Sequence, residues 1–322
     1  EGLSIIVPFL NESETINLFC RELDDYARHT AFPVELVFVD DGSIDNTSEL
    51  IKHYPFKKID KVKLISLSKN FGSHAAIRAG IKNATYEICT WMGSDLQEPI
   101  EFLELSYQRI INGDDAVYIE KKDINISKVE RSFSNLYSAL MRKYAVKNYS
   151  SGGISNIVFN GKIKKFLNEN VESNSSIMLQ IIDAGFKSST LSMHYKKRAA
   201  GISKWTLTKK IKLFIDSFVA FSFMPIRLVS IIGIIMFIIG ICFGLYIIIS
   251  KLINPINPVP GYSTIASLLA IGFGITNISL GIIAEYLWRT YDAARGRPAF
   301  IISDIVDVVN EDNNEVNNEQ NT

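Results

Sequence analysis

A short acidic stretch at residues 91–99, WMGSDLQEP, follows an apolar run and has the composition of a metal and phosphate site. Asp95 offers a carboxylate and Gln97 an amide oxygen, whereas Gly93 stands where metal-nucleotide sites usually have a second carboxylate. Mg²⁺ and Mn²⁺ take oxygen ligands, and such ions often keep waters and use only one or two carboxylates beside phosphate oxygens. The stretch therefore predicts a divalent-cation site with Asp95 as its acidic ligand and with Gln97 and waters around it.

A second acidic pair, Asp40 and Asp41, ends another apolar run and is followed by Gly42 and Ser43. Carboxylates accept hydrogen bonds from base N–H groups and ribose hydroxyls, so the pair suits a nucleotide pocket. The alternative is structural, because Asp, Gly and Ser also build tight turns and cap helices. The residues by themselves leave both interpretations open.

The elements that must position these residues alternate between strand-like and helix-like patterns. Strands are expected in LSIIVPF, VELVFVDD, VKLISL and EICTWM, and helices at residues 14–30, from residue 45, at 72–84 and at 99–112. This order, with nearly continuous apolar strands, predicts an α/β fold whose parallel sheet is covered on both faces. Ligands on such sheets lie beyond the carboxyl ends of the strands, so the two acidic stretches should share one cleft.

Two long runs without charged side chains follow, at residues 228–250 and 262–284. At about 1.5 Å per residue each run spans roughly 34 Å, which is enough for the core of a bilayer. Buried helices of a soluble core are the alternative, but such helices rarely lack charge over this length. Basic residues flank the hairpin on its outer sides and place its ends, with the N-terminal domain, in the cytoplasm: Lys209, Lys210, Lys212, Arg227, Arg289, Arg295 and Arg297.

These patterns divide the chain into seven parts. We expect a cytoplasmic domain at 1–205, a juxtamembrane amphipathic helix at 206–227, transmembrane helices at 228–250 and 262–288 joined by a short non-cytoplasmic loop at 251–261, a cytoplasmic juxtamembrane segment at 289–303 and a disordered acidic tail at 304–322. The basic and aromatic helix at 206–227 either lies in the membrane interface or packs on the sheet domain.

The composition excludes several classes of protein. Lys and Arg number 34 and Asp and Glu also 34, and this zero net charge argues against a nucleic-acid binder. The three cysteines are far apart, so neither a disulfide framework nor a C-x-x-C metal site is expected.

Five motifs occur in order within the first 205 residues: SIIVPFLNESE, VDDGSIDNT, NFGSHAAIRAG, GSDLQEP and RAAGISKW. Together with the two apolar runs and GIIAEYLWRTYDAARGRP, they make the chain resemble the polyprenyl-phosphate glycosyltransferases of glycosyltransferase family 2 from Leu3 to Ile302. That branch includes dolichol-phosphate mannose synthase and bacterial undecaprenyl-phosphate sugar transferases. The resemblance implies a GT-A fold, which is a Rossmann-like, mostly parallel sheet with helices on both faces, carrying interfacial amphipathic helices and a two-helix transmembrane hairpin.

The resemblance also implies a role for individual residues. Nucleotide binding is implied for Pro8, Leu10, Glu12, Asp40, Asp41 and Ser94. A catalytic role is implied for Asp95, Arg198 and Lys204, and binding of Mg²⁺ or Mn²⁺ for Asp95 and Gln97. Contact with the acceptor phosphate is implied for Arg131, Ser203 and Lys204. His74, Lys121 and Lys122 are further candidates near the donor or the acceptor.

The chain departs from the family pattern near Ser155, where similar proteins usually carry an aspartate that is often treated as catalytic. Here SSGGISNIVFN offers Ser151, Ser155 and Asn156 instead. A sugar hydroxyl needs a general base at neutral pH, whereas a phosphate monoester, with its second pKa near about 6, is already largely dianionic. The missing carboxylate therefore favours a lipid phosphate as the acceptor.

The resulting expectation is an inverting transferase that moves a sugar from a nucleotide donor, UDP-linked, to undecaprenyl phosphate for surface-glycan or O-antigen modification. It would be a multi-pass protein of the inner (cytoplasmic) membrane, with a flippase acting downstream and homo-oligomers as an option. One alternative is transfer to a hydroxyl of a lipid-linked saccharide, for which the fold must bring Glu98 or Asp183 to the cleft as a base. The other is a degenerate, non-catalytic membrane partner that binds nucleotide-sugar or lipid.

Overall fold

The computed structural model describes residues 1–122, 138–143, 146, 154–172, 175–195, 222, 224–253 and 261–308. The chain forms two compact units. Unit 1 combines Glu1–Ser217 with Pro298–Thr322, and unit 2 is Phe218–Arg297. The candidate site lies in unit 1.

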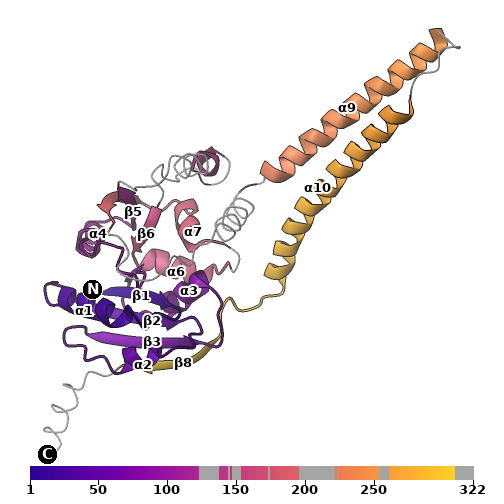
Figure 1. Ribbon diagram of the computed structural model, residues 1–322. Coiled ribbons are helices and arrows are strands. Elements are labelled where there is room, and N and C mark those ends of the chain that lie inside the picture. Colours follow the sequence, from indigo (N-terminus) through magenta and orange to yellow (C-terminus); the bar gives the residue numbers. More distant parts are fainter. Residues whose placement is uncertain are drawn as a thin grey trace, which may run out of the picture. The chain divides into compact units, whose positions relative to one another are not determined.

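Unit 1 is built on an eight-stranded sheet with the order β7-β5-β6-β4-β1-β2-β3-β8 (Figure 1). The strands are β1 (Leu3–Phe9), β2 (Val34–Asp40), β3 (Lys61–Leu67), β4 (Ile88–Trp91), β5 (Ala116–Lys122), β6 (Ile154–Phe159), β7 (Ser188–His194) and β8 (Ile302–Asp307). Four of the pairings between neighbours are parallel and those made by β6 and β8 are antiparallel. The predicted mostly parallel sheet is confirmed.

Helices cover both faces of this sheet, which explains why β1 and β2 are mostly apolar and almost completely buried. The helices of unit 1 are α1 (Ile16–Ala27), α2 (Thr47–Lys52), α3 (Ser73–Asn83), α4 (Glu101–Ile111), α6 (Gly161–Glu169) and α7 (Ile177–Asp183). Ile5 of β1 belongs to one buried cluster with Phe19 of α1 and Phe102 of α4. The next residue, Ile6, faces the other side and packs against Gly80 of α3, where any side chain would collide with it.

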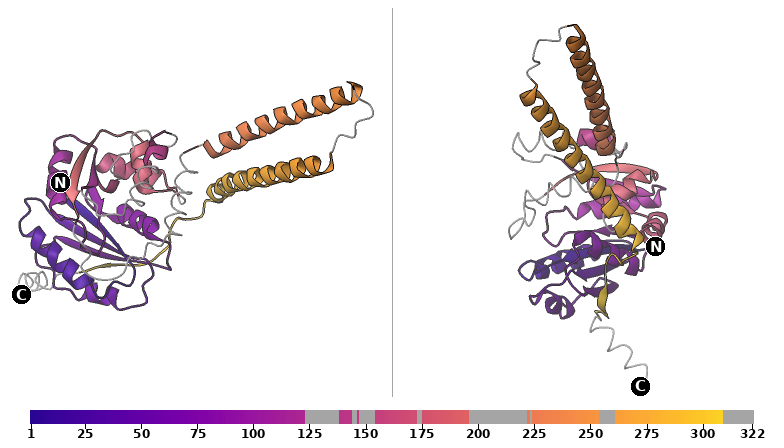
Figure 2. Two further views of the ribbon diagram at one scale, coloured as in Figure 1. Left: turned by 45° about the horizontal axis from the view of Figure 1, so that its top comes forward. Right: turned by 90° about the vertical axis from the view of Figure 1, so that its right-hand side faces the viewer.

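The C-terminal part of unit 1 differs from the sequence prediction. Ile302–Asp307 forms β8, which pairs antiparallel with β3 at the edge of the sheet (Figures 1 and 2). Backbone bonds at both ends extend the pairing, from Ser68 N to Ile301 O at 2.9 Å and from Val308 N to Val62 O at 2.8 Å. The prediction of a disordered tail beginning at residue 304 is therefore wrong as far as Val308. An edge strand buries only one side of its ladder, so its acidic, half-exposed sequence carries little strand signal.

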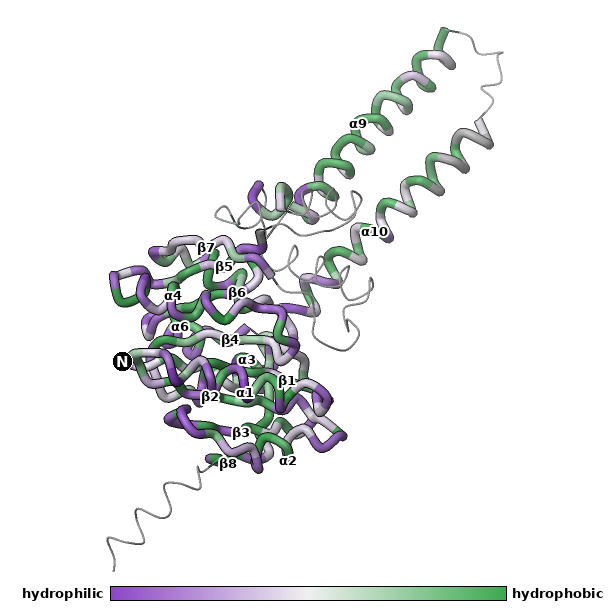
Figure 3. The backbone as a smooth tube through the Cα atoms, turned by 60° about the vertical axis from the view of Figure 1, so that its left-hand side comes forward, coloured by the Kyte–Doolittle hydropathy of each residue, from purple (hydrophilic) through white to green (hydrophobic). Residues whose placement is uncertain are grey.

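Unit 2 consists of α9 (Met224–Ile253) and α10 (Tyr262–Ala294), which run side by side in opposite directions (Figures 1 and 2). Met224–Ser250 and Ile271–Ala294 are long and apolar enough to cross a membrane, with mean hydropathies of 2.9 and 1.3. Figure 3 shows their largely hydrophobic colouring, and these windows are not buried within the protein. Helices of a soluble core would be buried, so that alternative does not fit. The predicted amphipathic segment lies outside the described residues up to position 221.

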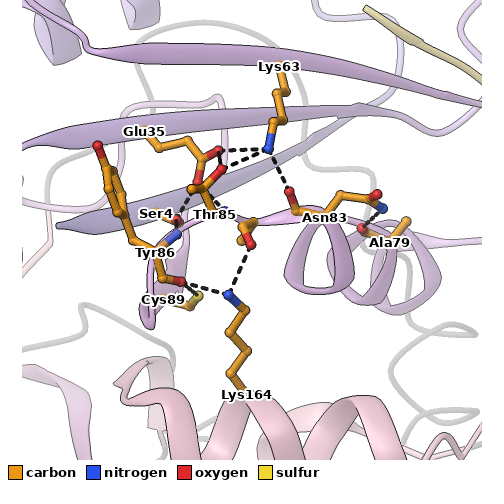
Figure 4. Close-up of polar contacts among 10 residues, drawn as sticks. Ser4, Glu35, Lys63, Ala79, Asn83, Thr85, Tyr86, Cys89 and Lys164 are labelled. Carbon is orange, nitrogen blue, oxygen red and sulfur yellow. Dashed lines mark hydrogen bonds and ion pairs between the residues drawn. The ribbon is translucent and has the colours of Figure 1, made fainter. Parts of the chain in front are cut away.

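A buried polar network fastens the sheet at the amino ends of its strands (Figure 4). The Glu35 carboxylate of β2 is fully buried. It accepts hydrogen bonds from Thr85 N and Thr85 Oγ1 at 2.7 Å and from Ser4 Oγ at 2.5 Å, and pairs with Lys63 Nζ at 3.1 Å. Burial raises the pKa of Glu35, but the bonds from Ser4, Thr85 and Lys63 outweigh it and hold the pKa below its ordinary value. The network therefore stabilises the charged carboxylate inside the fold.

We predict that Glu35→Gln lowers the free energy of unfolding by about 3 kcal/mol, because Lys63 and the Ser4 and Thr85 donors lose their buried charged partner. The measurement is a urea titration of the full chain in detergent at pH 7. Unfolding is monitored by the fluorescence of Trp91, in a protein whose other tryptophans have been replaced by phenylalanine.

The same variant has a defined pH dependence. A carboxylate whose pKa is lowered by folding stabilises the protein above its unfolded pKa, and this stabilisation is lost as the pH falls through the folded pKa. Acidification from pH 5 to pH 3 should thus destabilise the wild type more than Glu35→Gln. Glu49→Gln on α2 is the matched control, because Glu49 is 60% exposed and pairs only with surface residues. If Glu35→Gln and Glu49→Gln lose the same unfolding free energy on acidification, the prediction is contradicted.

Candidate active site

Three loops meet at the carboxyl edge of the sheet because β2, β1 and β4 run parallel as neighbours. Phe9 of β1 is in register with Asp40 of β2, and Ile6 of β1 is in register with Trp91 of β4. The edge therefore collects all six residues to which the sequence assigned nucleotide binding: Pro8, Leu10, Glu12, Asp40, Asp41 and Ser94. Asp95 follows β4 at the same edge, so the two acidic stretches lie together as predicted.

The loops after β1 and β2 are bonded into one structure. Asn11 N donates to Ser43 Oγ at 3.0 Å, and Ile44 N donates to Asn11 Oδ1 at 2.9 Å. Asn11 has a φ of 52° and Gly42 a φ of 80°, which is the left-handed region that Asn and Gly tolerate best. A side chain at Gly42 would also meet the backbone of Lys69 and Asn70. This wall of the site is therefore rigid before any ligand binds.

The carboxylates of Asp40 and Asp41 both hold neighbouring backbone in place. Asp40 accepts hydrogen bonds from Ser43 N at 2.7 Å and from Ser48 Oγ at 2.5 Å. Asp41 accepts from Phe71 N at 2.7 Å and from Gly72 N at 2.9 Å, just before α3. Burial raises the pKa of Asp41 against these bonds. The structural alternative thus accounts for the bonds seen, and a nucleotide contact, which the remaining lone pairs permit, stays a prediction.

The turn after β4 presents oxygen ligands of the kind a hard cation takes. Asp95 and Gln97 are partly exposed, and Gln97 N donates to Asp95 Oδ1 at 3.3 Å. Leu96 between them is buried with a φ of 55°, which bends the chain sharply. Among the described residues no group of three or more His, Cys, Asp or Glu side chains could hold a metal ion. The turn fits Mg²⁺ or Mn²⁺ bound by one or two protein oxygens together with phosphate and water.

From the sequence, Glu98 is a candidate base only on the condition that the fold brings it to the cleft. The structure places Glu98 at this edge of the sheet. Its carboxylate accepts hydrogen bonds from Gly93 N at 3.4 Å and from Asn156 Nδ2 at 3.2 Å. Asn156 is fully buried on β6 and also donates to the carbonyl oxygen of Trp91. Burial raises the pKa of Glu98 to about 7 against the bonds from Asn156 and Gly93, and the charge of Asp95 adds to the rise. Glu98 and Asn156 thus fasten the turn that carries Asp95.

Ser155 lies in the stretch where the resemblance to the family led us to expect an aspartate. Its hydroxyl donates to the carbonyl oxygen of Ile119 at 2.9 Å and forms a short hydrogen bond with the Tyr195 hydroxyl. Lys121 Nζ lies 4.3 Å from the centre of the Tyr195 ring. Burial, followed by the charge of Glu98, raises the pKa of Tyr195. The position therefore holds neutral, bonded hydroxyls.

The remaining sequence candidates fall in three places. Lys121 and Lys122 end β5 at the carboxyl edge, because β5 runs in the same direction as β4. Asp183 is exposed at the end of α7 and precedes β7, whose first residue pairs with Ala116 at the opposite edge. Asp183 is therefore excluded as a base at this site. The predicted phosphate and catalytic residues Arg131, Arg198, Ser203 and Lys204 lie outside the described residues.

A mostly parallel α/β sheet with acidic loops at its carboxyl edge is the arrangement expected of the GT-A fold. Residues 4–178 match the family described as Glycosyl transferase family 2. The chain belongs to this family and is a glycosyltransferase.

Relatives match it over nearly their whole length. The putative glycosyltransferase CsbB of Bacillus subtilis (strain 168) is 30% identical, with 98% of this chain and 95% of that protein covered. An undecaprenyl-phosphate 4-deoxy-4-formamido-L-arabinose transferase of Shewanella sediminis (strain HAW-EB3) is 29% identical, with 94% and 92% covered. Among solved structures, S. aureus TarS 1-349 with UDP-GlcNAc is 22% identical, with 69% of this chain and 74% of that chain covered and a TM-score of 0.42.

The turn around Gly93 makes metal affinity open to a direct test. An added Cβ at Gly93 would meet only the Asp95 side chain, at 3.3 Å, and the backbone there is not in the left-handed region. We predict that Gly93→Asp tightens Mn²⁺ binding about tenfold, equivalent to about 1.4 kcal/mol, because a second carboxylate joins the ligand set. Titration of the full chain with Mn²⁺ in the presence of UDP measures the effect.

Gly93→Asn is the matched control, because it adds the same volume without charge. It should leave Mn²⁺ affinity within about twofold of the wild type. If both variants tighten binding equally, or if neither does, Asp95 is not the acidic ligand of a cation at this turn.

Proposed function

We propose that the protein transfers a sugar from a nucleotide-sugar, UDP-linked, to undecaprenyl phosphate at the cytoplasmic face of a bacterial inner membrane. One observation carries the proposal: the same chain joins an acidic nucleotide-type edge to two exposed apolar helices of 30 and 33 residues. A lipid acceptor explains that combination, because its phosphate must be reached from the bilayer surface. Curated relatives named undecaprenyl-phosphate transferases, similar over more than 90% of the chain, support the same acceptor.

The geometry around Ser155 supports a phosphate rather than a hydroxyl as the nucleophile. An oxygen of the phosphate dianion attacks the anomeric carbon in line, the bond from that carbon to the nucleotide diphosphate breaks, and the configuration inverts. No proton has to leave the nucleophile, so the reaction needs no carboxylate where Ser155 stands.

The chain's own residues have separate tasks in this reaction. The bonded loops after β1 and β2 hold the nucleotide, and the turn fastened by Glu98 and Asn156 orients Asp95 and Gln97 toward the diphosphate. A divalent cation at that turn neutralises charge on the diphosphate when it is bound. Arg198 and Lys204 remain the proposed cations for the leaving group, and Arg131, Ser203 and Lys204 for the acceptor phosphate. Surface-glycan modification, a downstream flippase and self-association belong to the same proposal.

The decisive experiment incubates the full chain with undecaprenyl phosphate, Mn²⁺ and radiolabelled UDP- and GDP-sugars, and then separates the lipids. Label in an acid-labile glycolipid is the expected result. Label that appears only after addition of an oligosaccharide-lipid would support the hydroxyl acceptor instead. Nucleotide binding without any transfer would support the non-catalytic partner.

Asp95→Asn should lower turnover at least 100-fold while leaving the fold intact, since charge stabilisation at a developing anion is worth 10²–10³ in rate. Asp25→Ala on α1 is the control, because Asp25 is exposed and distant in the fold. Activity of Asp95→Asn near that of the wild type would remove Asp95 from the mechanism.

Glu98→Gln separates the two acceptors. A phosphate nucleophile needs no base, so the amide, which keeps an oxygen for Asn156, should lower turnover less than about tenfold. A hydroxyl nucleophile would require Glu98 as its base, and the loss would then reach the 10²–10⁴-fold that base catalysis contributes. Steady-state rates at saturating donor, measured with undecaprenyl phosphate and separately with the oligosaccharide-lipid, decide between them.

A further inference from the structure

Four polar side chains on or beside α3 and α7 each have one buried atom without a hydrogen-bond partner. In the described part of the chain these atoms are Arg78 Nη1, Gln180 Nε2, His74 Nδ1 and Ser175 Oγ. Arg78 and Gln180 are only 5% and 4% exposed. Buried polar groups are nearly always paired in folded proteins, so the unpaired atoms of Arg78 and Gln180, which contact each other, point to a missing partner.

Arg78 is buried without an ion-pair partner in the part of the chain that the structure describes, although burial lowers its pKa against the attraction of the nearby Glu172 charge. Its Nη2 donates to the carbonyl oxygen of Glu172 at 3.2 Å and to Gln180 Oε1, which are both uncharged acceptors. None of the ion pairs among the described residues includes Arg78. Burial and then the charge of Arg78 lower the pKa of His74, so that imidazole is neutral at pH 7. A buried cation that lacks a direct ion pair is costly until an anion or a strong acceptor bonds to it.

The cluster lies next to the nucleotide side of the active site. α3 begins at Ser73, directly after Gly72, whose N–H is bonded to Asp41. His74 is in the first turn of α3, and Arg78 is one turn further along the same side of the helix, about 6 Å away. The cluster is therefore placed just below the edge at which the donor binds.

We propose that Arg78, Gln180, Ser175 and His74 form a subsite for a carboxylate or amide carbonyl on the sugar of the nucleotide donor. The inference rests on the proposed function, because it assigns the substrate class of that site. The unpaired guanidinium and amide N–H groups only donate, and the hydroxyl can do so, so an sp² oxygen can satisfy several of them at once. A carboxylate would also give the guanidinium the direct ion pair that it lacks, whereas a sugar with hydroxyls alone would not.

The test is equilibrium binding to the full chain in detergent with Mn²⁺, using UDP, UDP-glucose, UDP-glucuronic acid and UDP-N-acetylglucosamine. UDP-glucuronic acid or UDP-N-acetylglucosamine should bind at least tenfold more tightly than UDP-glucose, and which of them does so separates the carboxylate from the amide. Arg78→Met should remove this difference and leave UDP binding unchanged. Equal binding of the three sugars overturns the subsite alone, whereas failure of UDP itself to bind overturns the donor of the proposed function.

A second variant keeps the inference testable if Arg78→Met does not fold. Gln180→Glu places a carboxylate against Arg78 and should act as a built-in ligand, raising the unfolding temperature by about 3 °C and removing the tenfold preference. Arg109→Met on α4 is the matched control, because Arg109 bonds Ser189 and Thr190 away from the site. It should leave the preference unchanged. A destabilised Gln180→Glu protein that keeps its preference would overturn the subsite.

Discussion

Parallel pairing of β2, β1 and β4 is the constraint on which the candidate active site depends. It brings the loops after these strands to one edge whatever side chains they carry, and so it places Asp40, Asp41 and Asp95 near one another. Carboxylates gathered in this way repel each other and lose water. Backbone N–H groups offset that cost, since Asp41 accepts hydrogen bonds from Phe71 and Gly72. The acidic edge is therefore stable as part of the fold before any ligand binds.

The pKa of a buried carboxylate is shifted in opposite directions at the two edges of the sheet. Glu35 at the amino edge is surrounded by donors and a lysine, and its pKa falls. At the carboxyl edge, burial raises the pKa of Glu98, because the bonds from one amide and one backbone N–H do not offset it and the charge of Asp95 adds to the rise. The first arrangement is complete within the chain and serves stability. The second leaves charge for a ligand to balance, which is typical of a site that works on a charged substrate.

Local patterns in the sequence were sufficient for the core of unit 1 and insufficient for its periphery. The strands around β1 and the helices between them follow from apolar runs and helical periodicity, so the edge with Asp95 was predictable. β8 was not, because its two aspartates and exposed face resemble a solvated tail. The bond between Glu98 and Asn156 joins β6 to a turn 58 residues earlier, and no local pattern encodes such a pairing. Arg78 was hidden in an otherwise apolar helical motif.

The roles of Ser155 and Glu98 together bear on the nature of the acceptor. A hydroxyl acceptor requires a base, and at this edge the described carboxylate most suited to that task is Glu98. Its oxygens already accept hydrogen bonds from Asn156 and Gly93, and these bonds hold the turn that carries Asp95. Proton uptake there would weaken both bonds at the moment when Asp95 must stay in place. An acceptor that arrives as an anion avoids this conflict, because no proton has to pass to Glu98 during the transfer.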